Sequence, residues 1–279
     1  MDKTESANIK KTTSIPGVSK ILAVASGKGG VGKSTTSVNL AVALSKHGQK
    51  VALMDADVYG PSIPKMLGIN EKPETSTDGK KIIPIKKYDI QAMSIGFLIP
   101  EDTPMIWRGP MVMSAIKQLL YEVMWEDVDI LVIDLPPGTG DTQLTLAQQV
   151  PITGSVIVST PQDIALLDVK KGINMFKKVD IPVLGVIENM SYFICPHCSE
   201  KSEIFSSGGA KTTAKNYDID FLGDIPLDTT IREQADNGEP VGINENKFSK
   251  IYSDIAKTLM NKLNNPDEKN MEPVIKFTE

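Results

Sequence analysis

Residues 27–35, GKGGVGKST, constrain this chain more than any other segment, because they match the phosphate-binding pattern GxxxxGK[ST] in full. The apolar residues 21–25 before them predict a buried strand, and residues 38–44 after them predict a helix that ends near Gly48. Glycines allow successive N–H groups to point at one anion, and the helix start adds its dipole. The alternative, a turn that binds nothing, is disfavoured by this context. We therefore expect nucleotide phosphates to contact the whole loop: Gly27, Lys28, Gly29, Gly30, Val31, Gly32, Lys33, Ser34 and Thr35.

Two lysines and a serine in this loop carry its chemistry. Lys33 supplies a positive charge for the β- and γ-phosphates, and Ser34 supplies a hydroxyl for Mg²⁺. Lys28 is either a solvated surface charge or a second functional lysine. The loop as a whole resembles the deviant Walker A loop of the ATPase class that includes nitrogenase iron protein and the Min and Par partition ATPases. That resemblance implies that Lys28 reaches across a homodimer interface to the partner's nucleotide and takes part in catalysis.

Three acidic residues stand at the ends of predicted strands. Residues 50–57 have the pattern of a strand that ends in Asp55 and Asp57, and the apolar residues 128–134 that of a central strand ending in Asp134. Acids in such positions lie on the ligand edge of a parallel sheet, although Asp55 and Asp57 have turn or cap roles as alternatives. Asp134 matches the Walker B arrangement, so its carboxylate would hold Mg²⁺. The same resemblance implies that Asp57 positions the attacking water and that Asp55 helps to hold the metal.

Strand and helix patterns alternate along the rest of the chain, which predicts an α/β fold with a doubly wound, mostly parallel sheet of the P-loop NTPase type. Asn189 is either a turn residue or, as the resemblance implies, a hydrogen-bond partner of the adenine edge. The apolar stripe of the last predicted helix, residues 247–263, favours core packing over a membrane-surface role. Further strands are predicted at 89–95, 155–160, 183–190 and 221–228, further helices at 111–123 and 163–177, and a hairpin turn at residues 78–79.

The chain's two cysteines form a C-x-x-C pair, Cys195 and Cys198. Such a pair is a redox dithiol, half of a zinc site or half of an iron–sulfur site. The redox dithiol is disfavoured because redox C-x-x-C motifs occur in a different arrangement of strand and helix from the one predicted here. A closed zinc or [4Fe–4S] site needs four ligands, whereas one chain offers two thiolates and His197, which is a less favoured third ligand. Two chains related by a two-fold axis would supply four thiolates, so this pair also predicts a homodimer.

Composition and charge set the remaining limits. A chain of 279 residues with 41% hydrophobic content suits one large α/β domain, and a formal net charge of −5 argues against general nucleic-acid binding. No apolar run approaches the roughly 20 residues that span a bilayer, so no membrane partner is expected. Residues 1–19 are polar and show neither an export signal nor a transit pattern, which predicts a cytoplasmic protein. We expect flexible tails at 1–19 and 265–279 and an ATPase domain at 20–264.

Six motifs together, GKGGVGKST, MDADVYGPSIP, WRGPM, VIDLPPGTGD, VIENMS and CPHC, resemble the Mrp/ApbC family of P-loop ATPases over nearly the whole chain. The resemblance implies a slow ATPase that uses ATP and Mg²⁺. It also implies that Cys195 and Cys198 hold a labile [4Fe–4S] cluster at the homodimer interface and that apo iron–sulfur proteins receive it. One alternative is a Min- or Par-like positioning ATPase with a structural zinc at the C-x-x-C pair. Another is a nucleotide-dependent scaffold that does not hydrolyse ATP.

Overall fold

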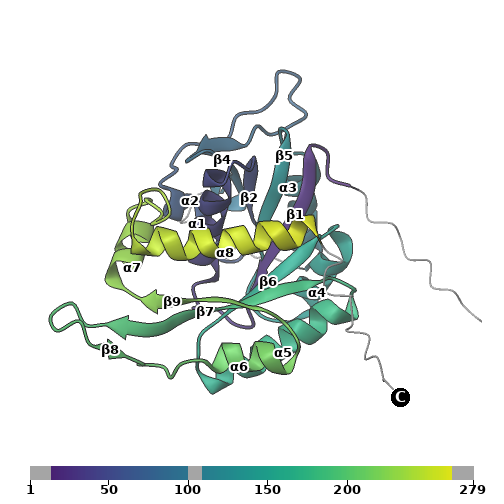
Figure 1. Cartoon of the computed structure of the whole chain (residues 1–279). Coiled ribbons are helices and arrows are strands. Elements are labelled where there is room, and N and C mark those ends of the chain that lie inside the picture. The colour runs from purple at the N-terminus through teal and green to yellow at the C-terminus, as the bar shows by residue number, and fades with distance from the viewer. Residues whose placement is uncertain (1–13, 100–108, 266–279) are drawn as a thin grey trace, which may run out of the picture.

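The computed structural model describes residues 14–99 and 109–265. Within these ranges the strands form one sheet in the order β3-β4-β2-β5-β1-β6-β7-β8, with β9 also paired to β7. Every pairing is parallel except those of β3 with β4 and of β7 with β8. The predicted doubly wound, mostly parallel sheet is therefore confirmed (Figure 1). The strands are β1 (Val18–Ala25), β2 (Val51–Asp55), β3 (Ile85–Lys87), β4 (Ile90–Ser94), β5 (Val128–Asp134), β6 (Gly154–Ser159), β7 (Val183–Ile194), β8 (Lys201–Ser202) and β9 (Phe221–Leu227).

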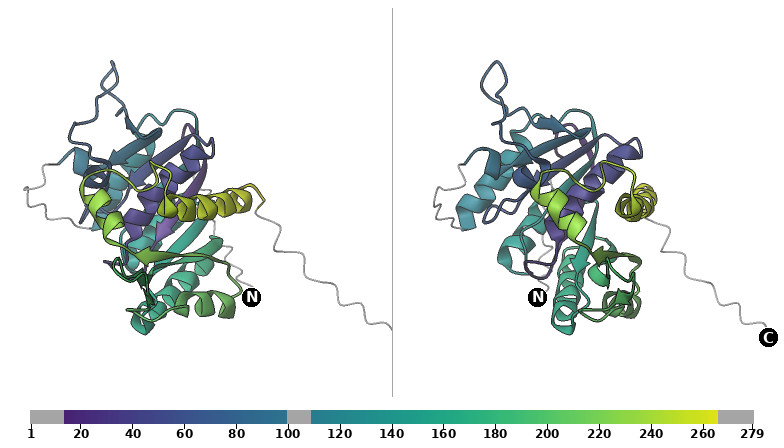
Figure 2. Two further views of the ribbon diagram at one scale, coloured as in Figure 1. Left: turned by 60° about the vertical axis from the view of Figure 1, so that its left-hand side comes forward. Right: turned by 90° about the vertical axis from the view of Figure 1, so that its left-hand side faces the viewer.

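Helices cover both faces of this sheet (Figure 2). On one face α1 packs against α8 and α2, and α2 packs against α7. On the other face α3, α4, α5 and α6 form a continuous layer, each in contact with the next. This division follows from right-handed crossovers between parallel strands, because the chain moves in opposite directions along the sheet before and after β4. The helices are α1 (Lys33–Lys46), α2 (Ile63–Leu67), α3 (Gly109–Tyr121), α4 (Asp141–Gln149), α5 (Asp163–Lys178), α6 (Gly209–Asn216), α7 (Thr229–Asp236) and α8 (Lys247–Asn264), with a short 3₁₀ turn η1 (Ile95–Phe97).

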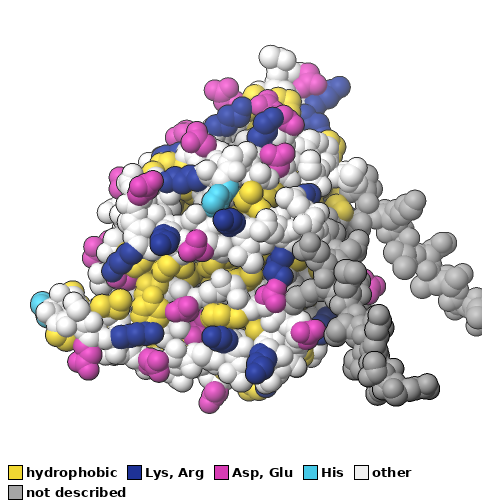
Figure 3. Space-filling model, viewed as in Figure 1, with side chains coloured by type: hydrophobic (Ala, Val, Ile, Leu, Met, Phe, Trp, Pro, Cys, Tyr) yellow, Lys and Arg dark blue, Asp and Glu magenta, His cyan; other side chains and the backbone are white. Residues whose placement is uncertain are grey.

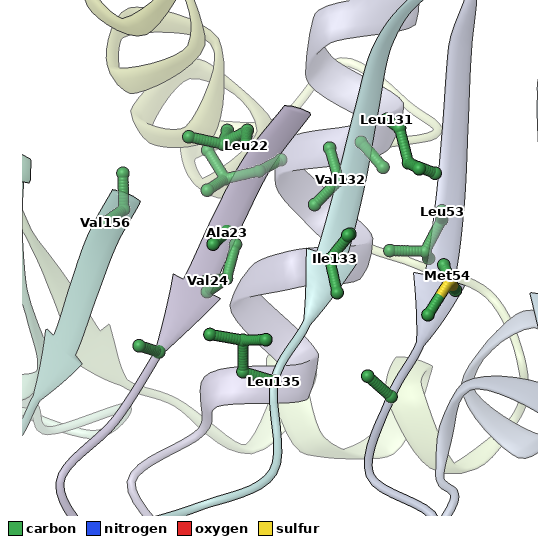
Figure 4. Close-up of a cluster of buried hydrophobic side chains, with 14 of the residues drawn as sticks. Leu22, Ala23, Val24, Leu53, Met54, Leu131, Val132, Ile133, Leu135 and Val156 are labelled. Atoms are coloured by element: carbon green, nitrogen blue, oxygen red, sulfur yellow. The ribbon is translucent and has the colours of Figure 1, made fainter. Parts of the chain in front are cut away.

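The centre of the core lies along β1, β5 and β2, whose apolar side chains point into both helix layers (Figure 4). β5 is buried along its length apart from the half-buried Asp129, as expected for a parallel strand with both faces covered. Its Ile133 is paired with Ala23 of β1 and Met54 of β2. This packing fixes the positions at which the three strands end.

The last helix docks on this core. Asn246 and Ser249 form a capping box that starts α8. The apolar stripe of the helix faces inward, as the sequence predicts, although Ile251 is only half-buried. None of the described helices combines the length and apolar character that crossing a membrane requires. The buried side chains of α8 are Phe248, Tyr252, Ile255, Ala256, Leu259 and Leu263.

Several details differ from the sequence-based expectations. The sequence predicts a strand over residues 183–190, yet β7 continues to Ile194 because it resumes pairing, with β8, after an irregularity at Met190 (φ +55°). Met111 begins the predicted apolar stripe of α3 but is 46% exposed, because it lies in the first turn of the helix. Gly79, at φ +68°, forms the predicted hairpin turn. The first residues of the WRGPM motif lie outside the described residues.

Candidate functional site

The carboxyl ends of β1, β2 and β5 meet at one edge of the sheet. The strand register places Asp134 of β5 between Val24 of β1 and Asp55 of β2. Strand order runs away from β1 in both directions, so the loop that follows β1 occupies a topological switch point, where α/β sheets bind ligands. The loop, residues 27–35, and the acids at the strand ends are thus brought to one place.

Glycines of the loop meet both conformational and packing demands. Gly30 and Gly32 have φ values of +78° and +81°, which side chains with a Cβ rarely adopt. A Cβ on Gly32 would lie 2.0 Å from Nδ2 of Asn189, and a Cβ on Gly27 would lie 2.1 Å from the Cβ of Asp168. The sequence pattern anticipates the φ requirement, whereas the two close contacts come from residues more than a hundred positions away.

Asp134 is the hub of the site and is completely buried. Its Oδ2 lies 2.7 Å from Nζ of Lys33 and accepts a hydrogen bond of 2.6 Å from Oγ of Ser34. Its Oδ1 accepts a 2.6 Å hydrogen bond from Oγ of Ser37. The sequence motifs do not single out Ser37, although it lies one helical turn after Ser34 and so shares its face of α1. Lys33, Ser34 and Asp134 are therefore brought together as the sequence predicts.

Asp55 and Asp57 differ in their surroundings. Asp55 is completely buried and accepts hydrogen bonds from Oγ of Ser94 and from the backbone N–H groups of Ile63 and Asp57. Burial raises its pKa to about 7, with a further increase from the charge of Asp134 and a decrease from Lys33. Burial also raises the pKa of Asp57, against the opposing charge of Lys33. Asp57 is only half-buried, so of the two acids it is the more accessible to water.

The raised pKa of Asp55 predicts that the stability of the nucleotide-free protein depends on pH. Its folded-state pKa of about 7 exceeds its ordinary value of 3.8, so the folded chain holds this proton more tightly than the unfolded chain. The stabilisation is complete below about pH 4 and is lost as the pH rises through about 7. We expect the free energy of unfolding, measured by urea denaturation, to fall by a few kcal/mol over this range. Asp55→Asn should remove most of this fall and leave the smaller contribution of Asp57, and an unchanged pH dependence in that variant would contradict the assignment.

The donor set at this edge fits a magnesium ion. The hydroxyl of Ser34 and the carboxylates of Asp134 and Asp55 are hard oxygen ligands, which Mg²⁺ prefers. In the present structure Lys33 neutralises the buried Asp134. The residues that would hold the metal are therefore Ser34 and Asp134, with Asp55 beside them in the neighbouring strand.

The remaining predicted residues of the nucleotide site surround the loop. Lys28 is half-buried, and no ion pair joins it to another described residue. Val31 is buried, and its carbonyl accepts a 2.8 Å hydrogen bond from Nδ2 of Asn189. Thr35 contributes its carbonyl to Nδ2 of Asn39. Asn189 thus contacts the loop itself, and its predicted contact with adenine stays a prediction.

Helix α8 supports the same loop through a buried tyrosine. A hydrogen bond joins the hydroxyl of Tyr252 to the side chain of Thr36, whose own hydroxyl donates to the carbonyl of Gly32. Because Thr36 donates its proton to Gly32, Tyr252 donates and Thr36 accepts. Burial raises the pKa of Tyr252, so its hydroxyl stays protonated at neutral pH. Nothing in the sequence distinguishes this tyrosine from the apolar residues of its stripe.

Tyr252→Phe removes one hydrogen bond and keeps the buried ring. We expect the free energy of unfolding to fall by about 1 kcal/mol, the usual net value of such a bond. The affinity for MgATP, measured by calorimetry, should fall by a few-fold because the Gly32 end of the loop is held less firmly. Tyr217→Phe is the matched control, since Tyr217 packs near α6, and it should leave MgATP affinity unchanged. Equal effects of the two substitutions on affinity would contradict a role for Tyr252 at the loop.

The two cysteines lie at the tip of the hairpin formed by β7 and β8, which extends from the body of the molecule as an arm (Figure 1). The backbone N–H of Cys195 donates to the carbonyl of Glu200, and the N–H of Ser199 donates to the carbonyl of Cys195. Backbone N–H groups of Cys198 and His197 point at the sulfur of Cys195 and, with the Cys198 thiol, lower its pKa. Ser199 adopts φ +59° to close the turn. The loop therefore shifts Cys195 toward its thiolate form.

No third ligating side chain joins this thiol pair within the part of the chain that the structure describes. Across residues 14–99 and 109–265, no three side chains of His, Cys, Asp or Glu come together as a metal site. Both cysteines are free, and Cys198 is exposed. Two thiolates are half of what a tetrahedral zinc or a [4Fe–4S] cluster takes from protein.

Comparison with known proteins identifies the family. The model of the family described as ParA, NUBPL iron-transfer P-loop NTPase, matches residues 17–260. This chain belongs to the NUBPL iron-transfer P-loop NTPases. The resemblance drawn from the six motifs is thus confirmed, as is the prediction of a nucleotide-binding P-loop fold.

Members of the NUBPL family and related structures resemble the chain over most of its length. The iron–sulfur cluster transfer protein NUBPL of Dictyostelium discoideum is 53% identical over 272 residues, which cover 95% of this chain and 84% of that protein. The iron–sulfur cluster carrier protein of Escherichia coli is 52% identical over 250 residues, which cover 89% of this chain and 68% of that protein. A nucleotide-binding protein from Archaeoglobus fulgidus, solved with ADP, is 40% identical with a TM-score of 0.70, covering 80% of this chain and 87% of its own.

Proposed function

We propose that this protein is an ATP-hydrolysing carrier that holds a [4Fe–4S] cluster between two copies of itself and passes it to apo iron–sulfur proteins. The observation that carries the proposal is the thiol pair at the tip of the arm, with Cys195 half-buried and Cys198 exposed, which has one thiol of lowered pKa yet supplies only half of a closed site. Carrier and transfer proteins at 52–53% identity support the same cargo.

The nucleotide site supplies the ATPase half of the proposal. Lys33 would bind the β- and γ-phosphates, with Ser34 and Asp134 holding the metal, and Mg²⁺ when bound would neutralise charge on those phosphates. Asp57 would orient the attacking water, since it is the accessible acid at this edge. Lys28, which has no ion-pair partner among the described residues, would be available to the nucleotide of the second copy.

The surface of the arm supports pairing with a second copy. Ile194 and Ile204 flank the thiol pair and are 38% and 54% exposed. Figure 3 shows apolar side chains on the arm and where it joins the body. Exposed apolar groups beside an incomplete ligand set favour a protein interface at this position. A positioning ATPase with a structural zinc is not favoured, since the similar proteins carry iron–sulfur names.

Anaerobic reconstitution with ferrous iron and sulfide tests the cargo. We expect a brown protein that absorbs near roughly 400 nm and holds about four iron and four sulfide ions per two chains. Light scattering should give the mass of a dimer for the loaded form, and an apo-protein of the [4Fe–4S] class should gain its cluster on mixing. Colourless protein with stoichiometric zinc, or a loaded monomer, would overturn the proposal. Phosphate release separates an ATPase from a scaffold that only binds nucleotide.

A further inference from the structure

Strand β7 touches both candidate sites. Near its middle, Nδ2 of Asn189 donates a 2.8 Å hydrogen bond to the carbonyl of Val31 in the phosphate-binding loop. At its end, Ile194 leads directly into Cys195. A single short segment of the strand therefore separates the nucleotide loop from the first thiol. Figure 1 shows β7 running from the body of the sheet out into the arm.

The backbone of β7 changes character between these two points. Asn189 is paired with Ile225 of β9, but the register shifts before the next pair, which joins Phe193 to Leu227. Met190 stands in this irregularity with φ +55°, a value that is uncommon for a residue with a side chain. Strand β7 is therefore irregular where it leaves the body of the sheet, and from Phe193 onward it also pairs with β8.

Glu188 bridges the two sides of the arm at this irregularity in β7. Its side chain is 1% exposed, and Oε1 accepts hydrogen bonds from Oγ of Ser191 at 2.6 Å and from the N–H of Gly208 at 2.9 Å. Oε2 accepts one from the N–H of Ala210 at 2.8 Å. Ser191 lies on the outgoing side of the arm and Gly208 on its return, so one carboxylate ties both sides at the base. Charge-assisted bonds of this kind are about twice as strong as neutral ones.

We propose that β7 couples the nucleotide loop to the thiol pair, with Glu188 as the positioning residue that transmits the coupling. A bound nucleotide contacts the backbone of the phosphate-binding loop, to which Asn189 is hydrogen-bonded. A shift of that backbone therefore moves Asn189 and, with it, the preceding residue Glu188. Because Glu188 ties both sides of the arm, the arm moves with it as one body and the thiols move with the arm. The inference rests on the proposed function in that the thiols are the cluster ligands.

Thiol reactivity in the cluster-free protein measures this coupling directly. Cys195 and Cys198 are the chain's two cysteines, so a chromogenic disulfide reagent reports on the arm without background. In the wild-type protein, MgATP should change the modification rate by about fivefold or more, the lower range of allosteric coupling. Glu188→Gln replaces one acceptor oxygen with a donor, and Ser191→Ala removes one bond to the carboxylate. Both should reduce the effect of MgATP to less than about twofold while MgATP affinity stays within about twofold.

Ser155→Ala is the matched control, because Ser155 is as buried as Ser191 but bonds to the carbonyl of Pro182 at the start of β7. It should keep the wild-type response. If Glu188→Gln fails to fold, Ser191→Ala decides. A wild-type rate that ignores MgATP, or a full response in both variants, overturns the coupling. Iron and sulfide analysis distinguishes the two proposals: a wild-type protein that takes no cluster but shows the response refutes the cargo alone, and one that takes a cluster without the response refutes the coupling alone.

Discussion

Lys33→Met is expected to abolish ATP hydrolysis and to weaken MgATP binding by about 100-fold, since it removes two charge-assisted contacts to phosphate oxygens. The same substitution leaves Asp134 buried without its cation, with only the hydroxyls of Ser34 and Ser37 as partners. Breaking a buried ion pair on one side costs about 3–5 kcal/mol, so the free energy of unfolding should also fall. Phosphate release and urea denaturation measure the two effects.

A second substitution separates chemistry from stability. In Lys33→Met/Asp134→Asn both charges are gone, so most of the lost stability should return while hydrolysis stays absent. Lys86→Met is the matched control, because Lys86 pairs with Glu126 at 2.8 Å on the exposed surface, where such pairs contribute about 0–1 kcal/mol. Hydrolysis by the double variant, or a loss of stability in the control equal to that of Lys33→Met, would refute the role given to Lys33.

The nucleotide site was predictable because its signals are local. GKGGVGKST fixes the loop through backbone conformation, and an apolar run that ends in an acid fixes both β5 and Asp134. The only further step is the rule that the carboxyl ends of parallel strands meet at one edge, and the observed register of Asp55 against Asp134 bears it out. Sequence alone therefore suffices to bring Lys33, Ser34 and Asp134 together.

The supporting residues were not predictable, because their roles depend on contacts distant in sequence. Tyr252 reaches Thr36 across more than two hundred positions and looks like any core residue of an amphipathic helix. Glu188 precedes the asparagine that the sequence singled out, but its partners Gly208 and Ala210 are known only once α6 is placed. The extension of β7 to Ile194 depends on β8, a strand of two residues that leaves no periodicity to detect.

The loop that carries the cysteines has a conformation that its short C-x-x-C motif does not predict. C-x-x-C predicts thiolate ligation but not the closure of its loop, which here places Ser199 at φ +59° and two backbone N–H groups against the sulfur of Cys195. The N–H groups lower the pKa of the Cys195 thiol, whereas the conformation of Ser199 closes the turn. The cysteines themselves are therefore the decisive residues to change.

Cys195→Ser and Cys198→Ser are each expected to eliminate cluster binding in anaerobic reconstitution. Each replaces a soft thiolate, the usual protein ligand of iron–sulfur clusters, with a hydroxyl. The tip of the arm carries little of the core, so MgATP affinity and the free energy of unfolding should stay close to wild type. His197→Ala is the control at the same tip, and it should keep the full iron and sulfide content. Loss of MgATP binding in the cysteine variants would mean that the pair is structural.

Mixing the wild-type protein with the Cys195→Ser/Cys198→Ser variant tests whether two chains share one cluster. If the four thiolates come from two copies, only wild-type pairs bind, so an equimolar mixture whose pairs form at random before loading and do not exchange during it should load about a quarter of its dimers. If each chain completed a cluster by itself, about half of the chains would load. Iron and sulfide content against total protein distinguishes the two values without any assumption about where the chains meet. The shared result would make dimerisation a consequence of ligand count, because each arm contributes two sulfurs and the described part of one chain gathers no group of three ligating side chains that could complete the site.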